Sequence, residues 1–474
     1  MNLTQLFFAF FLLIAGQNIK AQSIINGGFE EFADDGSFKN WKWSKSPGFN
    51  FLPELDKSIE GKYCARLSST VGNKNGGAAF VQTFTGKISG LKRVRYSMMI
   101  KTRDAGPVGF ILNAFCGRFN VYSNSELPST TILGTNDWKQ YSLEATLPTY
   151  TNALSFVGKL GGVGTAWFDD VKLEEIPLIV NPLPDSLANL SAEFLNVLDK
   201  YSVRRDSFDV KLLKKDIEAM SQGAVKKEDL GYGFLYAFAA TGDKKAKFAD
   251  GKRQPKIKNE QIAYPVAGVY KEKYAVVRIP SFYVLDTLQR LLYVDSLTAL
   301  IKSYDKSYIR GIMLDFRNCT QGDEGALFRG LAPFLKDQDT VLTFAATNAP
   351  NRAWRFNDSS IYNFKHHIPV AVLTSYNTGG AGEVAAIAFK HQKNVRVIGE
   401  PTAGLSTRTT EFQLSTGWVM QLSTGVFSDR TGKKYLERVE PDEFSNYPKD
   451  IKFSIDEDPV IFSAVQWFKT KGKL

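Results

Sequence analysis

The chain has 474 residues, 43% of them apolar, which is enough for large cores and more than one domain. Its net charge of +10 arises from 59 basic and 49 acidic side chains. This excess indicates a solvated surface, and we expect no nucleic-acid partner. Only three cysteines and three histidines are present, without the spacing of a zinc site.

Residues 1–21 are predicted to be a secretory signal peptide. Leu6 to Ala15 is an apolar run of ten residues, too short to span a bilayer comfortably, and Ala21 is a small residue at a plausible cleavage point. No cysteine follows to carry a lipid anchor, and no later segment is long and apolar enough to be a transmembrane helix. We therefore expect a soluble, exported protein, periplasmic or extracellular.

Residues 22–177 are predicted to form an all-β domain. Short alternating runs, such as "RVRYSMMIKT", "VGFILNAF" and "ALSFVGKL", are separated by Gly, Asn, Ser and Pro turns. Regularly spaced short strands are typical of a jelly-roll β-sandwich. Its Cys64 and Cys116 could pair in an oxidising compartment or remain two buried thiols. Residues 178–186 are Pro-rich and are predicted to be a linker.

Residues 187–263 are predicted to form a short helical cap and a basic loop. Five apolar side chains share one face of "LANLSAEFLNVLDKYS": Leu187, Leu190, Phe194, Leu195 and Leu198. The polar run "GDKKAKFADGKRQPKIKNEQ" is predicted to be a solvated loop. In residues 264–474, strand-like and helix-like runs alternate, which predicts an α/β layered core.

The two ends of the all-β region carry related motifs, "NGGFEEF" with "NWKW" at the start and "GGVGTAWFDDVKLEEI" at the end. Together they resemble the galactose-binding-like β-sandwich of carbohydrate-binding modules. The resemblance implies a structural Ca²⁺ held by carboxylates of both end strands, here Glu30 or Glu31 with Asp169 or Asp170. The alternative is a solvated acidic turn.

Four tryptophans of this domain could stack on sugars. Trp41 and Trp167 lie inside the strand motifs, so we expect them in the core. Trp43 and Trp138 are the more open candidates. Because this fold serves many kinds of partner, carbohydrate binding is an expectation from the resemblance alone.

Three pieces of the C-terminal region occur in order: "FAATGDKKAKF", then "YAVVRIPSF" with "IRGIMLDFRNCTQGDEGALF", then "VAVLTSYNTGGAGEVAAIAFKHQKNVRVIGEPTAGLST". They resemble the tail-specific (carboxy-terminal-processing) serine peptidase family. No insertion is long enough for a PDZ domain, which favours the tricorn-core-like branch. The resemblance implies a crotonase/ClpP-like α/β core that hydrolyses peptides without a cofactor for catalysis.

The resemblance also assigns positions to the catalytic groups. The family's nucleophilic serine lies three residues before the elbow glutamate, which is Glu383, so its position is Gly380. A glycine has no side chain with which to attack a carbonyl. The lysine base of one branch is replaced by Leu405, and the cap histidine of the tricorn-like branch by Lys245. The oxyanion donors would be the amides of Ala381 and Gly322.

A rescued mechanism would use Ser375 or Thr378 as nucleophile and Lys245 as base, provided that burial lowers the lysine pKa. We expect Lys245 to lie in a wet loop instead. We expect His366, His367 and His391 on the surface. The sequence thus predicts a catalytically degenerate peptidase fold that binds extended peptides, protein C-termini or glycans. A serine-type hydrolase of altered mechanism is the alternative.

Overall fold

The computed structural model describes residues 24–471 apart from gaps at 45, 56–57, 70–75, 89, 125–130, 251–262, 284–285, 336–339, 348–349, 357, 359 and 447–456. The chain divides into two compact units. One comprises Met1–Asn196 and Asp206–Gly242, and the other Val197–Arg205 and Asp243–Leu474. The predicted signal peptide, residues 1–21, lies outside the described residues.

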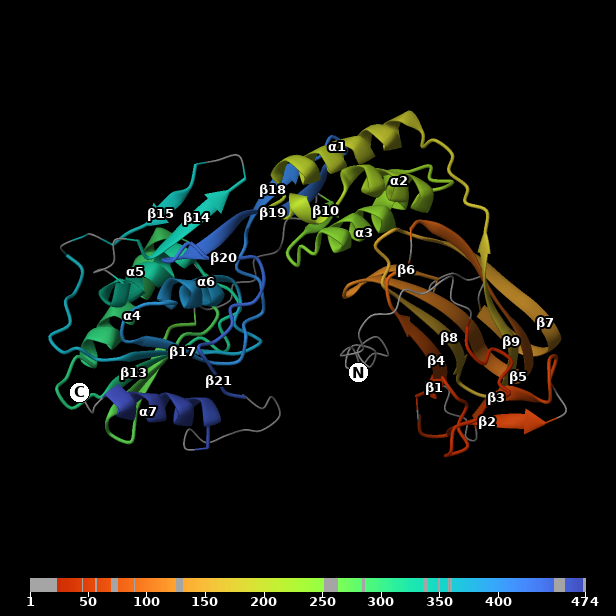
Figure 1. Cartoon of the computed structure of the whole chain (residues 1–474), viewed down its shortest axis with the longest axis horizontal. Coiled ribbons are helices and arrows are strands. Elements are labelled where there is room, and N and C mark those ends of the chain that lie inside the picture. The colour runs from red at the N-terminus through yellow and green to blue at the C-terminus, as the bar shows by residue number, and fades with distance from the viewer. Residues whose placement is uncertain are drawn as a thin grey trace. The chain divides into compact units, whose positions relative to one another are not determined.

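The first unit opens with the predicted β-sandwich, coloured red to orange in Figure 1. Its strands pair in the order β1-β4-β8-β5-β9-β3-β2, and β6 and β7 also pair with β5. The strands are β1 (Lys42–Trp43), β2 (Phe49–Leu55), β3 (Tyr63–Ser69), β4 (Gly77–Thr85), β5 (Lys92–Cys116), β6 (Phe119–Ser123), β7 (Thr131–Leu147), β8 (Ala153–Gly161) and β9 (Thr165–Ile176).

Strand β5 corrects the prediction of two separate strands at "RVRYSMMIKT" and "VGFILNAF". Both runs belong to one strand of 25 residues. The intervening Gly106 and Pro107 do not end it, because the pairing with β7 slips between Ala105 and Val108, and such irregularities tolerate a proline without an N–H. The N-terminal half of β5 pairs with β9 and the C-terminal half with β8.

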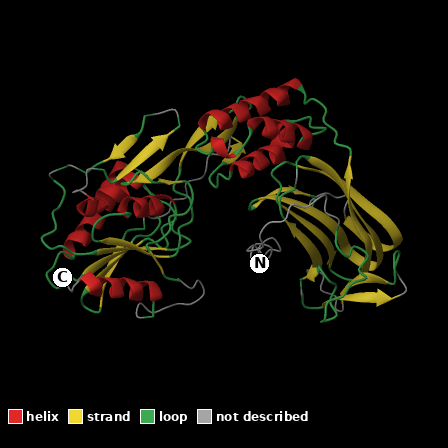
Figure 2. Cartoon of the chain, viewed as in Figure 1, coloured by secondary structure: helices red, strands yellow, loops and turns green. Residues whose placement is uncertain are grey.

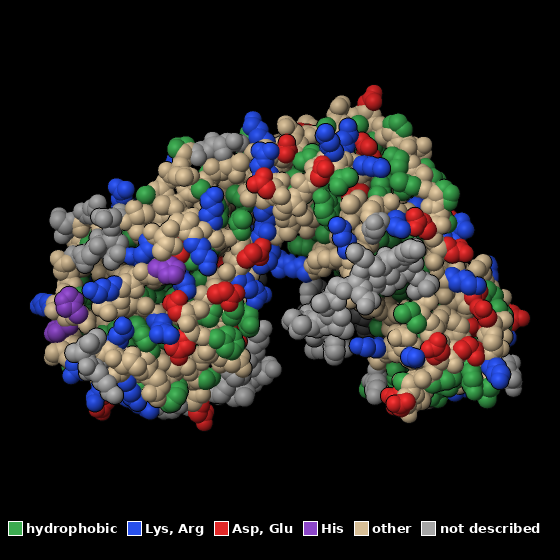
Figure 3. Space-filling model, in the orientation of Figure 1, with side chains coloured by type: hydrophobic (Ala, Val, Ile, Leu, Met, Phe, Trp, Pro, Cys, Tyr) green, Lys and Arg blue, Asp and Glu red, His purple; other side chains and the backbone are tan. Residues whose placement is uncertain are grey.

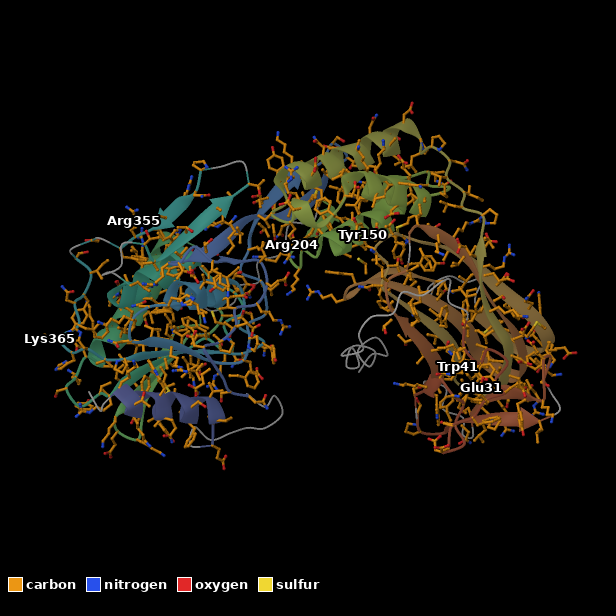
Figure 4. The ribbon with its side chains drawn as sticks, viewed as in Figure 1. Glu31, Trp41, Tyr150, Arg204, Arg355 and Lys365 are labelled. Carbon is orange, nitrogen blue, oxygen red and sulfur yellow. The ribbon has the colours of Figure 1, made fainter. Side chains whose placement is uncertain are left out.

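Aromatic packing forms the sandwich core. Phe80 is fully buried and contacts the rings of Phe51, Trp41 and Phe168 at centroid distances of 4.8, 5.3 and 4.9 Å. Trp41 and Trp167 are 5% and 2% exposed, so the expectation that they belong to the core is confirmed. The Trp41 indole donates to the Asn26 carbonyl, and the side-chain amide of Asn26 donates to the Glu31 carbonyl. Figure 4 labels Trp41 and Glu31 in this part of the sandwich.

The three cysteines are buried free thiols. Cys64 lies in β3 and Cys116 ends β5, so the buried-thiol alternative describes them. Burial raises the pKa of Cys116 to about 12, with a further contribution from the charge of Asp216. Cys116 is therefore not in the reactive thiolate form at neutral pH.

The helical segment comprises α1 (Asp185–Tyr201), α2 (Val210–Met220) and α3 (Gly231–Thr241), with short 3₁₀ turns at Arg205–Ser207 and Lys227–Leu230. Figure 2 shows these helices in red, next to the yellow strands of the sandwich. All five side chains of the predicted apolar face of α1 are buried, which confirms that face. Helix α2 begins after Asp209, whose side chain accepts the Lys211 amide hydrogen as an N-cap.

A buried carboxylate ties α2 and α3 to the sandwich. Asp216 of α2 accepts hydrogen bonds from the backbone amide and the hydroxyl of Thr149, which follows β7, at 3.1 and 2.8 Å. It also accepts the hydroxyl hydrogen of Tyr236 from α3. The prediction set the cap apart from the sandwich, whereas residues up to Asn196 and from Asp206 to Gly242 share its compact unit.

The second unit is built on a six-stranded sheet in the order β11-β12-β13-β16-β17-β21. Only β11 runs antiparallel to its neighbour. The strands are β11 (Val266–Tyr270), β12 (Tyr274–Arg278), β13 (Gly311–Asp315), β16 (Val370–Thr374), β17 (Val395–Gly399) and β21 (Glu443–Phe444). Strands β13 and β16 are buried along their whole length, as expected for a parallel sheet covered on both faces.

Helices cover both faces of this sheet, with α7 on one side and the others opposite (Figure 1). The helices are α4 (Thr287–Ser303), α5 (Glu324–Leu335), α6 (Gly380–Phe389) and α7 (Pro459–Lys471). Successive side chains of each strand point alternately to the two helical layers. Ala275 and Val277 of β12 pack with α4 to α6, while Tyr274 and Val276 pack with α7.

A second sheet was not predicted. It has the order β10-β19-β14-β15, with β18 and β20 paired to β19. Its strands are β10 (Lys247–Asp250), β14 (Leu342–Ala346), β15 (Arg352–Trp354), β18 (Arg408–Gln413), β19 (Trp418–Asp429) and β20 (Lys434–Tyr435). Strand β10 corrects the loop prediction for "KFAD", because Lys247–Asp250 pair with Trp418–Gln421 of β19.

Candidate active site

The ends of two neighbouring parallel strands create the candidate site. Asp315 of β13 pairs with Leu373 of β16, so the turn after β13 and the elbow after β16 emerge at the same edge of the sheet. The two segments are joined directly, because the Gly379 amide donates to the Cys319 carbonyl at 2.9 Å. In open α/β sheets this carboxyl edge is where ligands and catalytic groups gather.

Gly380 is the first residue of α6 and has a positive φ of 49°. A Cβ atom at this position would lie 2.9 Å from the Thr320 carbonyl oxygen and 3.2 Å from the Gln321 Cα. Real Cβ atoms do not approach a carbonyl oxygen this closely, and a side chain here would also carry the cost of the left-handed backbone. The predicted nucleophile position therefore has neither a side chain nor space for one.

Ser281 holds the turn around Thr320, which is the turn that blocks Gly380. The Ser281 hydroxyl accepts the Thr320 amide hydrogen at 2.7 Å and donates to the Asn318 carbonyl at 3.1 Å. Gly322, predicted as an oxyanion donor, faces the ring of Phe282, whose Cε1 would be 2.6 Å from an added Cβ. Sequence reasoning did not predict the contact between Ser281 and Thr320, because neither "IPSF" nor "NCTQG" carries a motif that indicates it.

Ala381, the other predicted oxyanion donor, is only 2% exposed. It adjoins Gly380 in the elbow, while Gly322 follows Gln321 in the blocking turn. The structure thus places the two predicted donors on the two segments that meet at Gly380. Their role as oxyanion donors stays a prediction.

Glu383 is fully buried and fixes the elbow helix to the "PTAGL" turn. Its Oε1 accepts the Thr402 hydroxyl and the Gly404 amide, the latter at 2.9 Å, and its Oε2 accepts the Leu405 amide at 2.6 Å. Burial raises the pKa of Glu383, although these hydrogen bonds act in the opposite direction. Every partner is a structural group of the turn, so Glu383 positions the elbow.

The two alternative nucleophiles are also buried, Ser375 at 2% and Thr378 at 0% exposure. The Ser375 hydroxyl donates to the Arg317 carbonyl at 2.6 Å, and the Thr378 hydroxyl donates to the Phe316 carbonyl at 3.0 Å. Each hydroxyl hydrogen is therefore directed at a backbone carbonyl. A general base must instead receive that hydrogen for the oxygen to attack.

Lys245 does not lie in a wet loop, which corrects that expectation. It is half-buried, its ammonium donates to the Thr407 carbonyl at 2.5 Å, and its amide donates to Asp243 at 2.9 Å. Burial lowers the pKa of Lys245, while the charges of Glu324, Asp243 and Glu383 oppose this effect. A desolvated lysine near the elbow is a feature that a Ser–Lys mechanism requires, but its hydrogen bond goes to a carbonyl.

Further charges surround Lys245. Arg408 of β18 forms an ion pair with Glu324 of α5 at 2.9 Å, and Lys244 forms one with Glu437 at 3.3 Å. The Lys244 ammonium also lies 2.5 Å from the point where a Cβ on Gly404 would stand. Lys244 and Lys245 thus both contact the 404–407 segment, to which the Glu383 carboxylate also binds. Three of the predicted site positions, Lys245, Glu383 and Leu405, therefore lie close together.

The three histidines are outside this cluster, and Figure 3 shows histidine side chains at the surface of the C-terminal unit. The His366 ring contacts the Asp305 carboxylate at 2.8 Å, and the His391 ring lies 3.5 Å from Asp429. The side chains of His366 and His391 are 39% and 47% exposed, as expected for surface residues.

The predicted calcium ligands of the sandwich already have protein partners. Glu30 accepts the amides of Lys62 and Tyr63 at 2.8 and 2.7 Å, and Asp169 accepts those of Ile59 and Glu60 at 2.6 and 3.1 Å.

The remaining two carboxylates form ion pairs, Glu31 with Lys39 and Asp170 with Lys172. Within the described ranges, no three His, Cys, Asp or Glu side chains are grouped as a metal site. This donor set does not fit the several free oxygen ligands that calcium takes. The calcium site that the family resemblance implies is thus not supported by this arrangement, and it stays an untested prediction.

The candidate site thus lies on a mainly parallel sheet with helices on both faces, at a small-residue elbow that is followed by the buried Glu383. Residues 273–444 match the model of peptidase family S41. The C-terminal unit therefore contains a peptidase family S41 domain, which confirms the predicted relationship to the carboxy-terminal-processing peptidases.

Individual relatives cover parts of the chain. The nisin-resistance protein of Lactococcus lactis subsp. lactis is 27% identical over 186 residues, which are 37% of this chain and 54% of that protein. The match thus spans about half the length of that relative. The photosystem II D1 C-terminal processing protease has 14% identity and a TM-score of 0.43, covering 59% of this chain and 97% of that one.

The N-terminal β-sandwich resembles carbohydrate-binding modules. One of them, TmCBM61 solved with β-1,4-galactotriose, has 15% identity and a TM-score of 0.24, covering 32% of this chain and 97% of that one. The predicted multidomain architecture of sandwich and peptidase core is confirmed. Among the helices of the described residues, none is long and apolar enough to cross a membrane.

Proposed function

We propose that the S41 domain of this protein performs no serine peptidase chemistry and acts by binding extended polypeptide. The observation that carries the proposal is the Gly380 position, where the Thr320 carbonyl occupies the space of a nucleophile side chain. Without a nucleophile, no acyl-enzyme can form. In this proposal, Glu383 holds the elbow in place and Lys245 contributes positive charge to the site.

Binding requires only the parts that this domain keeps. Extended peptides attach to β-sheets mainly through backbone hydrogen bonds, and this attachment needs no serine. The candidate ligands are extended peptides and protein C-termini. The buried clamps at Glu383, Ser375 and Thr378 hold the elbow rigid, and a rigid site loses less entropy on binding.

The sandwich would supply a second contact, and carbohydrate is the candidate ligand. Its half-buried Trp43 and Trp138 are the side chains available for stacking on sugar rings. Export to the periplasm or the outside of the cell completes the proposal, resting on the apolar run Leu6 to Ala15.

Incubation of the mature protein with an unstructured polypeptide tests the proposal. Fluorescence anisotropy measures binding and mass spectrometry measures cleavage in the same samples. We expect saturable binding and intact polypeptide. Cleavage that disappears in Ser375→Ala or Thr378→Val would establish the alternative, a hydrolase of altered mechanism. The absence of both binding and cleavage would refute the binding function.

A further inference from the structure

Strand β11 ends its sheet, and within the described residues it pairs only with β12. The outer side of an edge strand presents N–H and C=O groups that can pair with an added strand. Natural edges are usually protected by charged residues or proline, but β11 has the sequence VAGVY. Val266 and Val269 are 60% and 45% exposed. This edge is therefore suited to strand addition.

A hollow of about 220 Å³ lies beside this edge on the α7 face of the sheet. Helix α7 packs on the central strands, where Val460, Ala464 and Phe468 join a core with Met313 and Leu373. The hollow lies between the β11–β12 hairpin and α7. Its lining includes Tyr270, Lys271 and Lys273 of the hairpin and Phe462 and Lys469 of α7.

The charge of the hollow is positive. Lys273 and Lys469 form no ion pair with any residue that the structure describes, and the Lys271 ammonium lies 5.0 Å from the centre of the Tyr270 ring. Glu272 is the one acidic residue of the hairpin turn. Phe462 is 57% exposed and adds an apolar surface. Lysines around an open hollow attract carboxylates, with a strength that falls with salt.

The direction of the β11 side chains connects the edge with the hollow. Tyr270 packs on the α7 side of the sheet and Ala267 on the opposite side, so Val266 and Gly268 also face the α7 side. In a strand added to β11, every second side chain would face the α7 side of the sheet, where the hollow lies at the Tyr270 end of β11. A second copy of this chain would bring its own lysines against these, so charge complementarity argues against self-pairing.

We propose that the β11 edge, with Lys271, Lys273 and Lys469, binds an extended acidic polypeptide as an additional strand. Acidic side chains at alternate positions of the bound segment lie against the lysines. The surface is separate from the elbow at Gly380 and does not depend on its chemistry. It places acidic partner segments on the C-terminal unit whether or not its S41 domain is a hydrolase.

The test uses the whole mature protein and a fluorescein-labelled peptide of alternating valine and glutamate, with fluorescence anisotropy as the readout. A second labelled peptide alternates valine and lysine. Lys273→Glu/Lys469→Glu should weaken binding of the valine–glutamate peptide by roughly tenfold or more and favour the valine–lysine peptide. Val269→Lys should weaken binding of both peptides by charging the edge. Lys214→Glu, on the exposed side of α2, is the matched control and should change nothing.

Unchanged affinity in the double lysine variant would overturn the proposal, provided that circular dichroism shows the variant folded. Equal binding of a scrambled peptide of the same composition would also overturn it, because strand addition requires the alternation. A dimer in light scattering that Val269→Lys dissociates would assign the edge to a second copy instead. A positive result of the polypeptide cleavage test leaves this surface unaffected, so the two proposals fail separately.

Discussion

The carbonyl oxygen of Thr320 lies 2.9 Å from the point where a Cβ on Gly380 would stand. The predicted nucleophile position is therefore crowded by the neighbouring turn, which Ser281 holds in place. A serine added at this position would have to displace backbone atoms. The degenerate character that we propose is thus a property of two segments together.

Gly380→Ser should lower the free energy of unfolding by roughly 1–3 kcal/mol, because the new side chain overlaps the Thr320 carbonyl and takes a positive φ. Gly417→Ser is the matched control, since Gly417 has a φ of 82° and nothing within 4 Å of its added Cβ. Urea denaturation measures both. Equal losses in the two variants would mean that the Thr320 contact has no cost.

Gly380→Ser should also fail to restore peptide cleavage. By the predicted correspondence, Lys245 takes the place of the cap histidine and Leu405 that of the family lysine, so a hydroxyl at this position would have neither base. Mass spectrometry of the polypeptide after incubation measures cleavage. Turnover by this single variant would show that only the serine is missing.

Glu383→Gln should destabilise the fold by roughly 1–3 kcal/mol near neutral pH. The reason is that the NH₂ group of the new side chain must face one of the backbone N–H groups that now donate to Glu383. Glu411→Gln, on the exposed side of β18, is the control. Denaturation midpoints compare the two variants. A loss in Glu383→Gln no greater than in Glu411→Gln would exclude the clamp.

The stability difference between the wild type and Glu383→Gln should also depend on pH. Burial raises the pKa of Glu383, so the folded state holds this proton more tightly than the unfolded chain does. The stability that this tighter proton binding contributes is fully present below the ordinary pKa of 4.5, and it is lost as pH rises through the raised pKa of the folded state. Urea titrations at several pH values should show the wild-type advantage shrinking with pH. A growing advantage would contradict the sign.

Asp216→Ala should loosen the cap from the sandwich, because Thr149 and Tyr236 lose their shared acceptor in a buried place. We expect a loss of roughly 2–4 kcal/mol, the cost of leaving two polar partners unsatisfied. Glu218→Ala, on the same helix and partly exposed, should cost much less. Thermal unfolding checks this, and similar losses would show that the link contributes nothing.

Removal of calcium should leave the melting temperature of the protein unchanged. Glu30 and Asp169 accept amide hydrogens of residues 59–63, so the end strands are closed by hydrogen bonds. Differential scanning fluorimetry with EGTA, then with added Ca²⁺, measures this. A fall with EGTA that calcium reverses would establish the metal site that the family resemblance implies.

Local periodicity predicted much of the fold because its signals are short-range. The buried face of α1 and the strand β16 before the elbow are examples. The sheet around β19 was missed because its strands pair with segments far apart in the chain. Strand β5 was divided in the prediction because Gly106 and Pro107 signal a turn in isolation, and only pairing with β7 shows an irregular continuous strand.

The candidate site could be located from the sequence but not understood from it. The spacing from Gly380 to Glu383 predicted the elbow, and it predicted that the nucleophile position holds a glycine. The Thr320 obstruction depends on where the turn after β13 lies, which no spacing encodes. Lys245 was expected in solvent because its neighbours are basic, yet pairing of β10 with β19 draws that segment into the fold.

Labelling by a serine-directed fluorophosphonate, followed by intact-protein mass spectrometry, tests the central claim most directly. We expect the mature protein to keep its unmodified mass, because Gly380 has no hydroxyl and the hydroxyls of Ser375 and Thr378 donate to backbone carbonyls. A stoichiometric adduct that is lost in Ser375→Ala or Thr378→Val would contradict the claim and establish a serine-type or threonine-type mechanism.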